Sequence, residues 1–258
     1  MYPFEESFTI QDGVPKWHGR PVPGVDAATF RALGGNWAVD DQKVFVQCSH
    51  RKSIDRKSFE FLNPVFVKDA RAVYDWSKPI AGADPATFEV LDPGFVPGDD
   101  IVAKPTYQSY ARDKNAVYFH DQMFGKACVL RGADRDTFRS FRNGFGADHQ
   151  QVWSLNYRLK GAHAPSWVYL GGGYSIDREK VFYLDRPLPG VVREKFCVIL
   201  HPGVRLATDG TQFFSNDSPI SRKEFIEDCL GEFAISPKWV ENELKERCGL
   251  AFTAKTKN

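Results

Sequence analysis

Apolar and polar positions follow a fixed order that the chain repeats: an aspartate, three residues, then a β-branched or aromatic residue followed by an aromatic one. Aspartate is typical of turns, whereas the pair after it is typical of a strand. With an aromatic residue upstream, the pattern predicts a strand, a tight turn and a second strand, and later turn residues indicate a third. The six copies are Asp40 with Val44-Phe45, Asp69 with Val73-Tyr74, Asp113 with Val117-Tyr118, Asp148 with Val152-Trp153, Asp177 with Val181-Phe182 and Asp209 with Phe213-Phe214, and a degraded copy runs from Asp12 to Trp17.

A second pattern lies between successive copies of the first: Gly, a small residue, Asp, two residues, Thr or Ser, and a large aromatic residue. In the copy at Asp84-Pro85, an N-cap acceptor precedes a residue suited to the first helical position. Phe88 and Leu91 would then share one helical face. We therefore expect a short helix after each hairpin. The clearest copies span residues 24–30, 82–88 and 132–138, and looser ones keep the spacing from Asp55, His163, Val192 and Ser221.

Together the two patterns predict an α+β protein of tandem repeats, in which each short antiparallel hairpin or meander is followed by a short helix. About seven units would form a single domain over residues 1–235. Units of about 29 residues are short for four-stranded propeller blades, so a curved array is favoured over a closed propeller. Ser236-Pro237 and the spacing of Val240, Leu244 and Cys248 predict a C-terminal capping helix over residues 236–250, followed by a disordered tail over 251–258.

Two runs of the chain resemble the two halves of the repeat in the bacterial DKNYY family. They are residues 110–119, which contain Asp113-Lys114-Asn115, and residues 82–88, and the likeness extends over roughly residues 12–228. The resemblance implies a bacterial source and a fold defined by its repeat, without assigned catalytic residues. By analogy at the level of class, it also implies a general character similar to the immunity proteins that neutralise secreted bacterial toxins.

Charge and cysteine usage narrow the class of function. Lys and Arg number 34 against 33 Asp and Glu, so there is no global positive field to favour a nucleic-acid partner. The first residues show no secretory signal, and no apolar run is long enough for a bilayer. The cysteines are odd in number and form no Cys-x-x-Cys pair, which indicates neither a disulfide framework nor a zinc site. We expect a cytoplasmic protein, with Cys197 as a small core residue.

Catalytic motifs are absent from the sequence. There is no Gly-x-Ser-x-Gly elbow, no phosphate-binding glycine loop ending in Lys and no His-Glu-x-x-His helix. The glycine run at 171–173 precedes a turn and is interpreted as a connector. We therefore expect no enzyme activity, no cofactor and no metal.

Three departures from the repeat are the candidates for function. The first is an insertion from about Asp92 to Ser109, which contains Asp99 and Asp100; insertions in repeat arrays often lie on the binding face. The second is the series Arg135, Arg139 and Arg142, which would share a helical face. The third is a chemically varied row just beyond the strand pair, rich in the residue types of interface hot spots. Its candidate partner-binding residues are Asp75, Trp76, His120, Asp121, Asp185 and Arg186.

The main hypothesis is a non-catalytic, cytoplasmic protein-binding module, most concretely an immunity-type protein that binds and neutralises a secreted bacterial toxin. A carbohydrate-binding or small-ligand-binding protein that uses the aromatic side chains is the alternative, and a scaffold without a dedicated ligand is another. The sequence leaves open the oligomeric state, the partner and the face that binds it.

Overall fold

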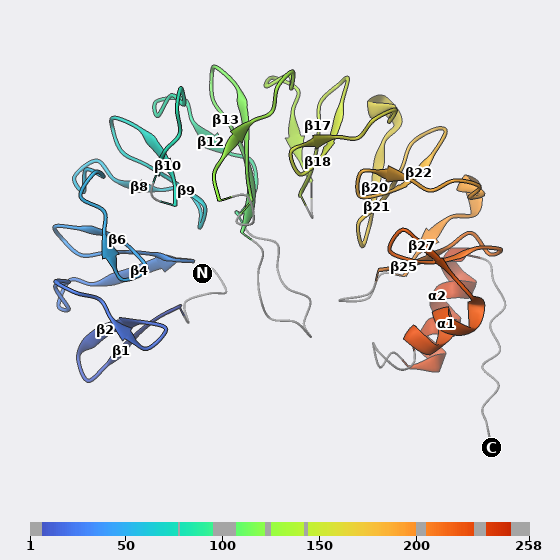
Figure 1. Cartoon of the computed structure of the whole chain (residues 1–258), viewed down its shortest axis with the longest axis horizontal. Helices are drawn as coiled ribbons and strands as arrows, with labels where there is room; N and C mark the ends of the chain where they lie inside the picture. Colours follow the sequence, from blue (N-terminus) through green and yellow to red (C-terminus); the bar gives the residue numbers. More distant parts are fainter. Residues whose placement is uncertain are drawn as a thin grey trace. The chain divides into compact units, whose positions relative to one another are not determined.

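The computed structural model describes residues 7–76, 78–94, 107–121, 125–141, 144–199, 205–229 and 236–248. Within these ranges the chain forms seven small antiparallel sheets, one after another along the sequence (Figure 1). It divides into two compact units, which we call the N-terminal unit (residues 1–96 and 105–140) and the C-terminal unit (residues 97–104 and 141–258).

The first four sheets lie in the N-terminal unit, and the strands of every sheet follow chain order. The first sheet has three strands and the next three have four each. Their strands are β1 (Phe8–Gln11), β2 (Val14–Trp17) and β3 (Arg20–Pro21); β4 (Arg31–Gly34), β5 (Trp37–Val39), β6 (Val44–Val46) and β7 (Ser49–His50); β8 (Glu60–Phe61), β9 (Phe66–Lys68), β10 (Val73–Asp75) and β11 (Lys78–Pro79); and β12 (Glu89–Val90), β13 (Gln108–Arg112), β14 (Val117–Asp121) and β15 (Cys128–Val129).

Three further four-stranded sheets follow, and the chain ends in helices. Their elements are β16 (Arg139–Ser140), β17 (Phe145–Ala147), β18 (Val152–Ser154) and β19 (Tyr157–Arg158); the 3-10 turn η3 (Ala164–Ser166), β20 (Val168–Gly171), β21 (Tyr174–Ile176), β22 (Val181–Tyr183) and β23 (Arg186–Pro187); the 3-10 turn η4 (Arg193–Lys195), β24 (Cys197–Val198), β25 (Leu206–Thr208), β26 (Phe213–Ser215) and β27 (Ser218–Ile220); and the helices α1 (Arg222–Glu227) and α2 (Pro237–Cys248).

The prediction of an α+β fold with a helix after each hairpin is wrong, because the described residues form mostly β-sheet and contain two short α-helices. The segment predicted as a helix at Asp84 is a tight turn, closed by a hydrogen bond of 2.6 Å from Thr87 Oγ1 to the carboxylate of Asp84. The chain then becomes extended, and Glu89 pairs with Arg112. Pairing across the sheet thus overrides the local helix preference, and it adds a fourth strand that the sequence did not indicate.

The repeated aspartate holds its hairpin and the preceding linker turn with one carboxylate. Oδ1 of Asp177 accepts hydrogen bonds from the amides of Glu179 and Lys180 at 2.8 and 2.7 Å. Its Oδ2 accepts from the amide of His163, in the linker turn, at 2.7 Å. The Oδ1 contacts recur at all six repeated aspartates, and the linker contact is present at Asp40, Asp69, Asp113, Asp177 and Asp209.

The first sheet departs from this arrangement. Asp12 and Gly13 form the two-residue turn between β1 and β2, with φ of 53° and 74°. Gln11 therefore stands where the other hairpins have their buried aspartate, and its side chain accepts from Lys16 Nζ at 2.9 Å. Asp12 and Trp17 have the sequence spacing of the repeat, but Asp12 lies in the turn itself, one residue after the position that the hairpin aspartate occupies in the other sheets.

Aromatic residues from the linker turns fill the cores between neighbouring sheets. Phe88 contacts Phe66 and Tyr118, with ring centroids 5.4 and 5.5 Å apart. At the other end of the chain, Leu244 of α2 packs into a cluster with Phe213 and other residues of the last sheet and α1. The predicted C-terminal helix therefore exists, and it covers apolar residues of the last sheet.

The cysteines differ from expectation in one respect. Cys197 is buried in β24, as predicted, but it is disulfide-bonded, which the spacing of the cysteines did not indicate. Cys48, Cys128 and Cys229 form no disulfide bond. Burial raises the pKa of the Cys229 thiol to about 12, which keeps it protonated and unreactive at neutral pH.

Candidate functional site

Three of the predicted site residues meet in the N-terminal unit, between the sheet that contains β10 and the sheet that contains β14. Asp75 ends β10, and its buried carboxylate accepts a hydrogen bond from the backbone amide of Ala127. His120 lies on β14, and its Nδ1 is 3.4 Å from Asp75 Oδ2. Trp76 follows Asp75 and lies over His120 with the ring planes 22° apart. The residues are far apart in sequence, and the packing of the two sheets joins them.

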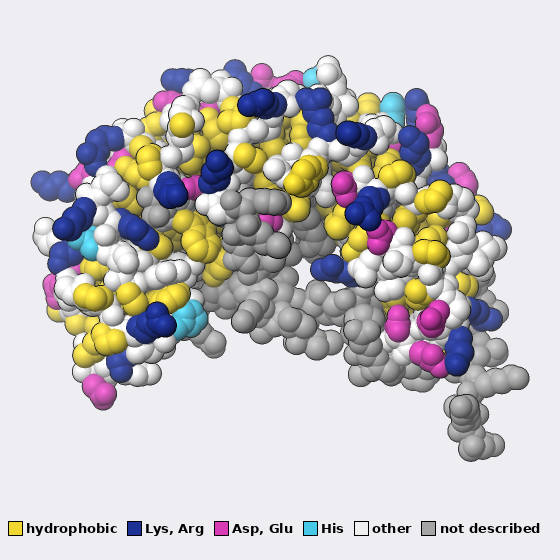
Figure 2. Space-filling model, viewed as in Figure 1, with side chains coloured by type: hydrophobic (Ala, Val, Ile, Leu, Met, Phe, Trp, Pro, Cys, Tyr) yellow, Lys and Arg dark blue, Asp and Glu magenta, His cyan; other side chains and the backbone are white. Residues whose placement is uncertain are grey.

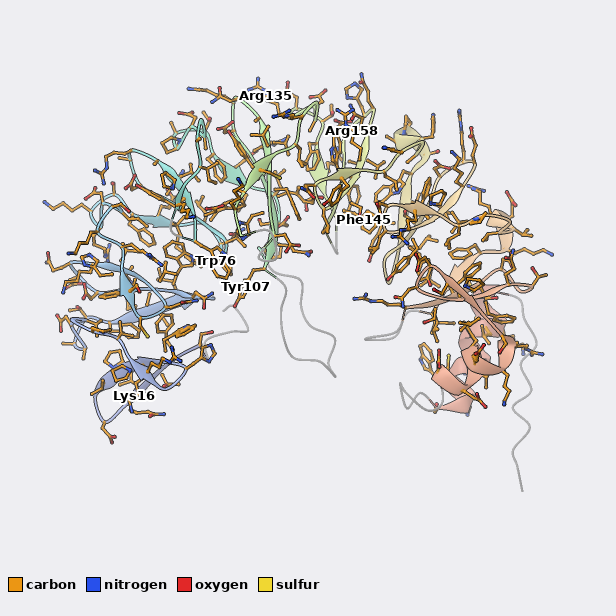
Figure 3. The ribbon with its side chains drawn as sticks, in the orientation of Figure 1. Lys16, Trp76, Tyr107, Arg135, Phe145 and Arg158 are labelled. Atoms are coloured by element: carbon orange, nitrogen blue, oxygen red, sulfur yellow. The ribbon has the colours of Figure 1, made fainter. Side chains whose placement is uncertain are left out.

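Tyr107 completes what we call the Trp76 cluster: Asp75, Trp76, Tyr107 and His120. The rings of Trp76 and Tyr107 lie edge to face, with centroids 6.2 Å apart, and both side chains are partly exposed. The two residues lie near each other on the opposite side of the N-terminal unit from Arg135 (Figure 3). The cluster thus combines an aromatic surface with a buried acid and a buried imidazole.

The backbone at Trp76 is in the left-handed region, with φ of 49°. That conformation is uncommon for a bulky residue. Gln47, Leu155, Leu184 and Asn216 adopt it at the corresponding turns. The turn is therefore a property of the repeat, whereas the Trp side chain is particular to this one sheet.

Two ring nitrogens of the cluster are buried without a hydrogen-bond partner among the described residues: Nε1 of Trp76 and Nε2 of His120. A carboxylate only accepts hydrogen bonds, so the contact with Asp75 places a proton on His120 Nδ1. Trp76 Nε1–H is a donor.

An aspartate hydrogen-bonded to a histidine is also two-thirds of a nucleophilic triad. Ser109 faces His120 across the β13–β14 ladder. However, its hydroxyl accepts from Asn63 Nδ2 at 2.9 Å and donates to the carbonyl of Tyr110 at 3.3 Å. Among the described residues, no hydroxyl or thiol lies within hydrogen-bond distance of His120 Nε2.

The other predicted residues lie in different surroundings. Asp121 is buried at the end of β14, where its Oδ2 accepts from Gln108 Nε2 at 2.6 Å. Asp185 and Arg186 belong to the C-terminal unit, are exposed, and are not part of the Trp76 cluster. Arg186 forms an ion pair of 2.9 Å with Asp217. Asp99 and Asp100 lie outside the described residues.

The start of the predicted insertion is anchored by a buried carboxylate. Asp92 Oδ2 accepts from the Tyr110 amide and from Ser140 Oγ, both at 2.8 Å, and Oδ1 accepts from the Gly94 amide at 3.0 Å. Burial raises the pKa of Asp92, and these donors only partly oppose the rise. The sequence analysis named Asp92 only as the start of the insertion and did not single out Tyr107, which lies within it. An acid before Pro-Gly and an aromatic residue just before a strand were the signals that could have found them.

Arg135, the first residue of the arginine series, forms hydrogen bonds that hold the fold on the side of the N-terminal unit away from the Trp76 cluster. Arg135 donates to the carbonyl of Lys114, and Arg112 donates to the carbonyl of Arg135 at 2.9 Å. A shallow polar depression of about 310 Å³ lies here, but Arg112 already pairs with Glu89 and Arg135 with Asp136. Arg139 is exposed on β16 rather than on a helix, and Arg142 lies outside the described residues. The predicted helical arginine face is therefore wrong.

The distribution of charged side chains does not indicate a further binding site. Lys and Arg side chains are dispersed among Asp and Glu on the visible face of each unit (Figure 2). No group of three or more His, Cys, Asp or Glu that could hold a metal ion occurs within the described ranges. None of the helices in that part of the chain combines the length and apolarity needed to cross a membrane.

Comparison with protein families gives two overlapping matches to the model of the DKNYY family, over residues 15–156 and 66–218. The first match alone spans more than half of the chain. The chain belongs to the DKNYY family. No curated protein and no solved structure matches it.

The overlap of the two DKNYY matches agrees with the repeated sheets, because a pattern that recurs can align in more than one register. The residues that the DKNYY repeat shares between sheets are the hairpin aspartate, its strand pair and the linker aromatic, all of which hold the fold. The Trp76 cluster adds to this repeat Trp76, Tyr107 and His120, which the other described sheets lack at the corresponding places.

Proposed function

We propose that this DKNYY protein is a non-catalytic, cytoplasmic binding module, and that it binds a protein partner through the Trp76 cluster. The observation that carries the proposal is the partly exposed Trp76–Tyr107 pair above the buried Asp75–His120 pair. The pairs lie between the third sheet and the fourth, whose β13–β14 hairpin has strands of five residues and is preceded by the predicted insertion. Trp and Tyr supply much of the binding energy at protein interfaces, and flanking polar groups fix the orientation.

As the class of partner we propose a secreted bacterial toxin, which the protein would neutralise as an immunity-type inhibitor. Family membership and the surface-rich repeat architecture support this proposal. An inhibitor that covers the active surface of a toxin needs only a complementary surface of its own. A repeat array offers a larger exposed surface for this purpose than a compact fold with an enclosed site.

A pull-down from lysate of the source organism, with mass spectrometry, tests the proposal. We expect one stoichiometric protein whose isolated expression is toxic and whose toxicity this chain relieves. The variant Trp76→Asn should weaken binding by tenfold or more, since truncating a hot spot costs about 2 kcal/mol or more. Asn tolerates the left-handed turn, as Asn216 shows at the corresponding position, so the backbone should be kept.

Leu184→Asn is the matched control, because Leu184 has φ of 49° at the corresponding turn in the C-terminal unit. Unchanged binding by Trp76→Asn, or equal loss in both variants, would contradict the assignment of the Trp76 cluster. Binding of a saccharide that quenches Trp fluorescence in the wild type but not in Trp76→Asn would instead favour a carbohydrate ligand, for which aromatic faces are also suited.

A further inference from the structure

The outer edge of β1 is unlike every other sheet edge among the described residues. The first sheet has three strands where the others have four, and the strand missing is the one that would pair with β1. In the fourth sheet the corresponding position is filled by β12, whose Glu89 pairs with Arg112 of β13. The amide of Leu91, just after β12, donates to the carbonyl of Tyr110 at 2.9 Å. Phe8 and Ile10 are the counterparts of Tyr110 and Arg112.

The hairpin geometry shows which backbone groups of β1 face outward. Gln11 and Val14 close a two-residue turn and so form a hydrogen-bonded pair. Such pairs alternate along the ladder, so Thr9 also points toward β2. The amides and carbonyls of Phe8 and Ile10 therefore point to the open edge, where no described strand accepts them.

The β1 edge also lacks the devices that protect edge strands from pairing. Short length, charge, Pro and bulges are the usual protections. Every other outer strand in the described residues is two or three residues long, or carries a charge, a Pro or a bulge. β1 has four residues, Phe-Thr-Ile-Gln, pairs regularly with β2, and exposes 59% of the Ile10 side chain.

We propose that β1 is an interface between two copies of this chain, which pair antiparallel through their β1 edges about a two-fold axis. The register is self-complementary: Phe8 of each copy faces Ile10 of the other, and Thr9 faces Thr9. Each Phe8–Ile10 pair exchanges two backbone hydrogen bonds, and Thr–Thr is a favourable cross-strand pair. β1 carries no charge to oppose the approach, and a two-fold contact of this kind closes after two copies.

The interface is small, so the dimer should be weak and in exchange with monomer. Analytical ultracentrifugation over a wide concentration range should show the mass rise from monomer toward dimer and no further. Hydrogen exchange at the Phe8 and Ile10 amides should slow as protein concentration increases.

Two variants separate the contributions of backbone and side chain. Ile10→Pro removes the outward N–H at both copies without touching the β1–β2 ladder, and should weaken association by about tenfold. Ile10→Lys keeps the N–H but places like charges across the axis, so its weakening should diminish at high salt. Ile10→Val is the matched control and should associate like the wild type. Circular dichroism checks that each variant is folded.

A mass that stays monomeric at every concentration would overturn the proposal. So would a dimer that survives both Ile10→Pro and Ile10→Lys, since another surface would then hold it. Phe8 and Ile10 amides protected equally at low and high concentration would show that a segment of the same chain covers the edge instead. Trp76→Asn should leave association unchanged, which keeps this test independent of the proposed function.

Discussion

Asp177 shows how one residue sets the geometry of a repeat. Its fully buried carboxylate accepts three backbone amides, two from its own hairpin and one from the linker turn before the sheet. A carboxylate is the shortest group able to accept on both sides, and Asn can accept on only one. These hydrogen bonds explain why aspartate recurs at this position without any role in binding a ligand.

Replacing Asp177 should destabilise the fold. We expect Asp177→Ala to lower the free energy of unfolding by about 2–4 kcal/mol, because it leaves buried amides unsatisfied. Asp177→Asn should lose less, because the Oδ1 contacts to the hairpin are kept. Urea unfolding measures both. Asp185 is an exposed acid in the same unit, and Asp185→Ala should change the free energy of unfolding by less than about 0.5 kcal/mol. Equal losses at the two sites would contradict the structural role given to the Asp177 carboxylate.

At the scale of elements, two copies of the linker pattern, one from Asp84 and one from Ser221, have the same spacing but form different structures. The linker at Asp84 forms a turn, because Thr87 bonds back to the Asp84 carboxylate and the chain then joins a sheet. The linker at Ser221 begins α1, because Glu224 and Ser221 form a reciprocal capping box. The helix prediction was therefore right at this copy, where the third residue after the cap is Glu rather than Thr or Ser.

The terminal helix offers a test of capping. Leu244 of α2 is 3% exposed and packs with Phe225 and Phe213. Leu244→Ala should destabilise the protein by about 2–4 kcal/mol, as expected for a buried Leu. Thermal unfolding followed by circular dichroism measures the loss. Lys245→Ala, at an exposed position of the same helix, is the control and should have little effect; similar losses would argue against packing as the cause.

At the scale of the whole molecule, the repeated hairpin aspartates, which we call the aspartate clamps, make the free energy of unfolding depend on pH. Burial acts to raise the pKa of Asp209, but the amides of Val192, Gln212 and Thr211 outweigh it and bring the pKa down to about 2. The pKa values of Asp40, Asp69 and Asp177 are lowered by similar amide contacts. An unfolded aspartate titrates near 3.9, so the unfolded chain binds more protons in this range.

Stability should therefore be fully present above about pH 4 and fall progressively as the pH decreases toward 2. Urea midpoints measured between neutral and acid pH test this expectation. Asp209→Asn should have lower stability at neutral pH and a smaller dependence on acid, because one of the titrating clamps is gone. A stability that is unchanged or rises on acidification would contradict the role of the clamps.

The sequence alone determined the features that depend on neighbouring residues: the number and spacing of the repeats, the hairpin turns at aspartate, the terminal helix and the family. It also picked out Asp75, Trp76 and His120 by their departure from the repeat. Tertiary structure decided what depends on residues far apart in the chain. Strand pairing turned the predicted helices into a fourth strand, and sheet packing brought His120 onto Asp75 and Tyr107 onto Trp76. Among the described residues, no fourth strand pairs with the outer edge of β1. Local propensities are small beside the free energy of forming a sheet and burying its faces, so the sheet decided wherever the two disagreed.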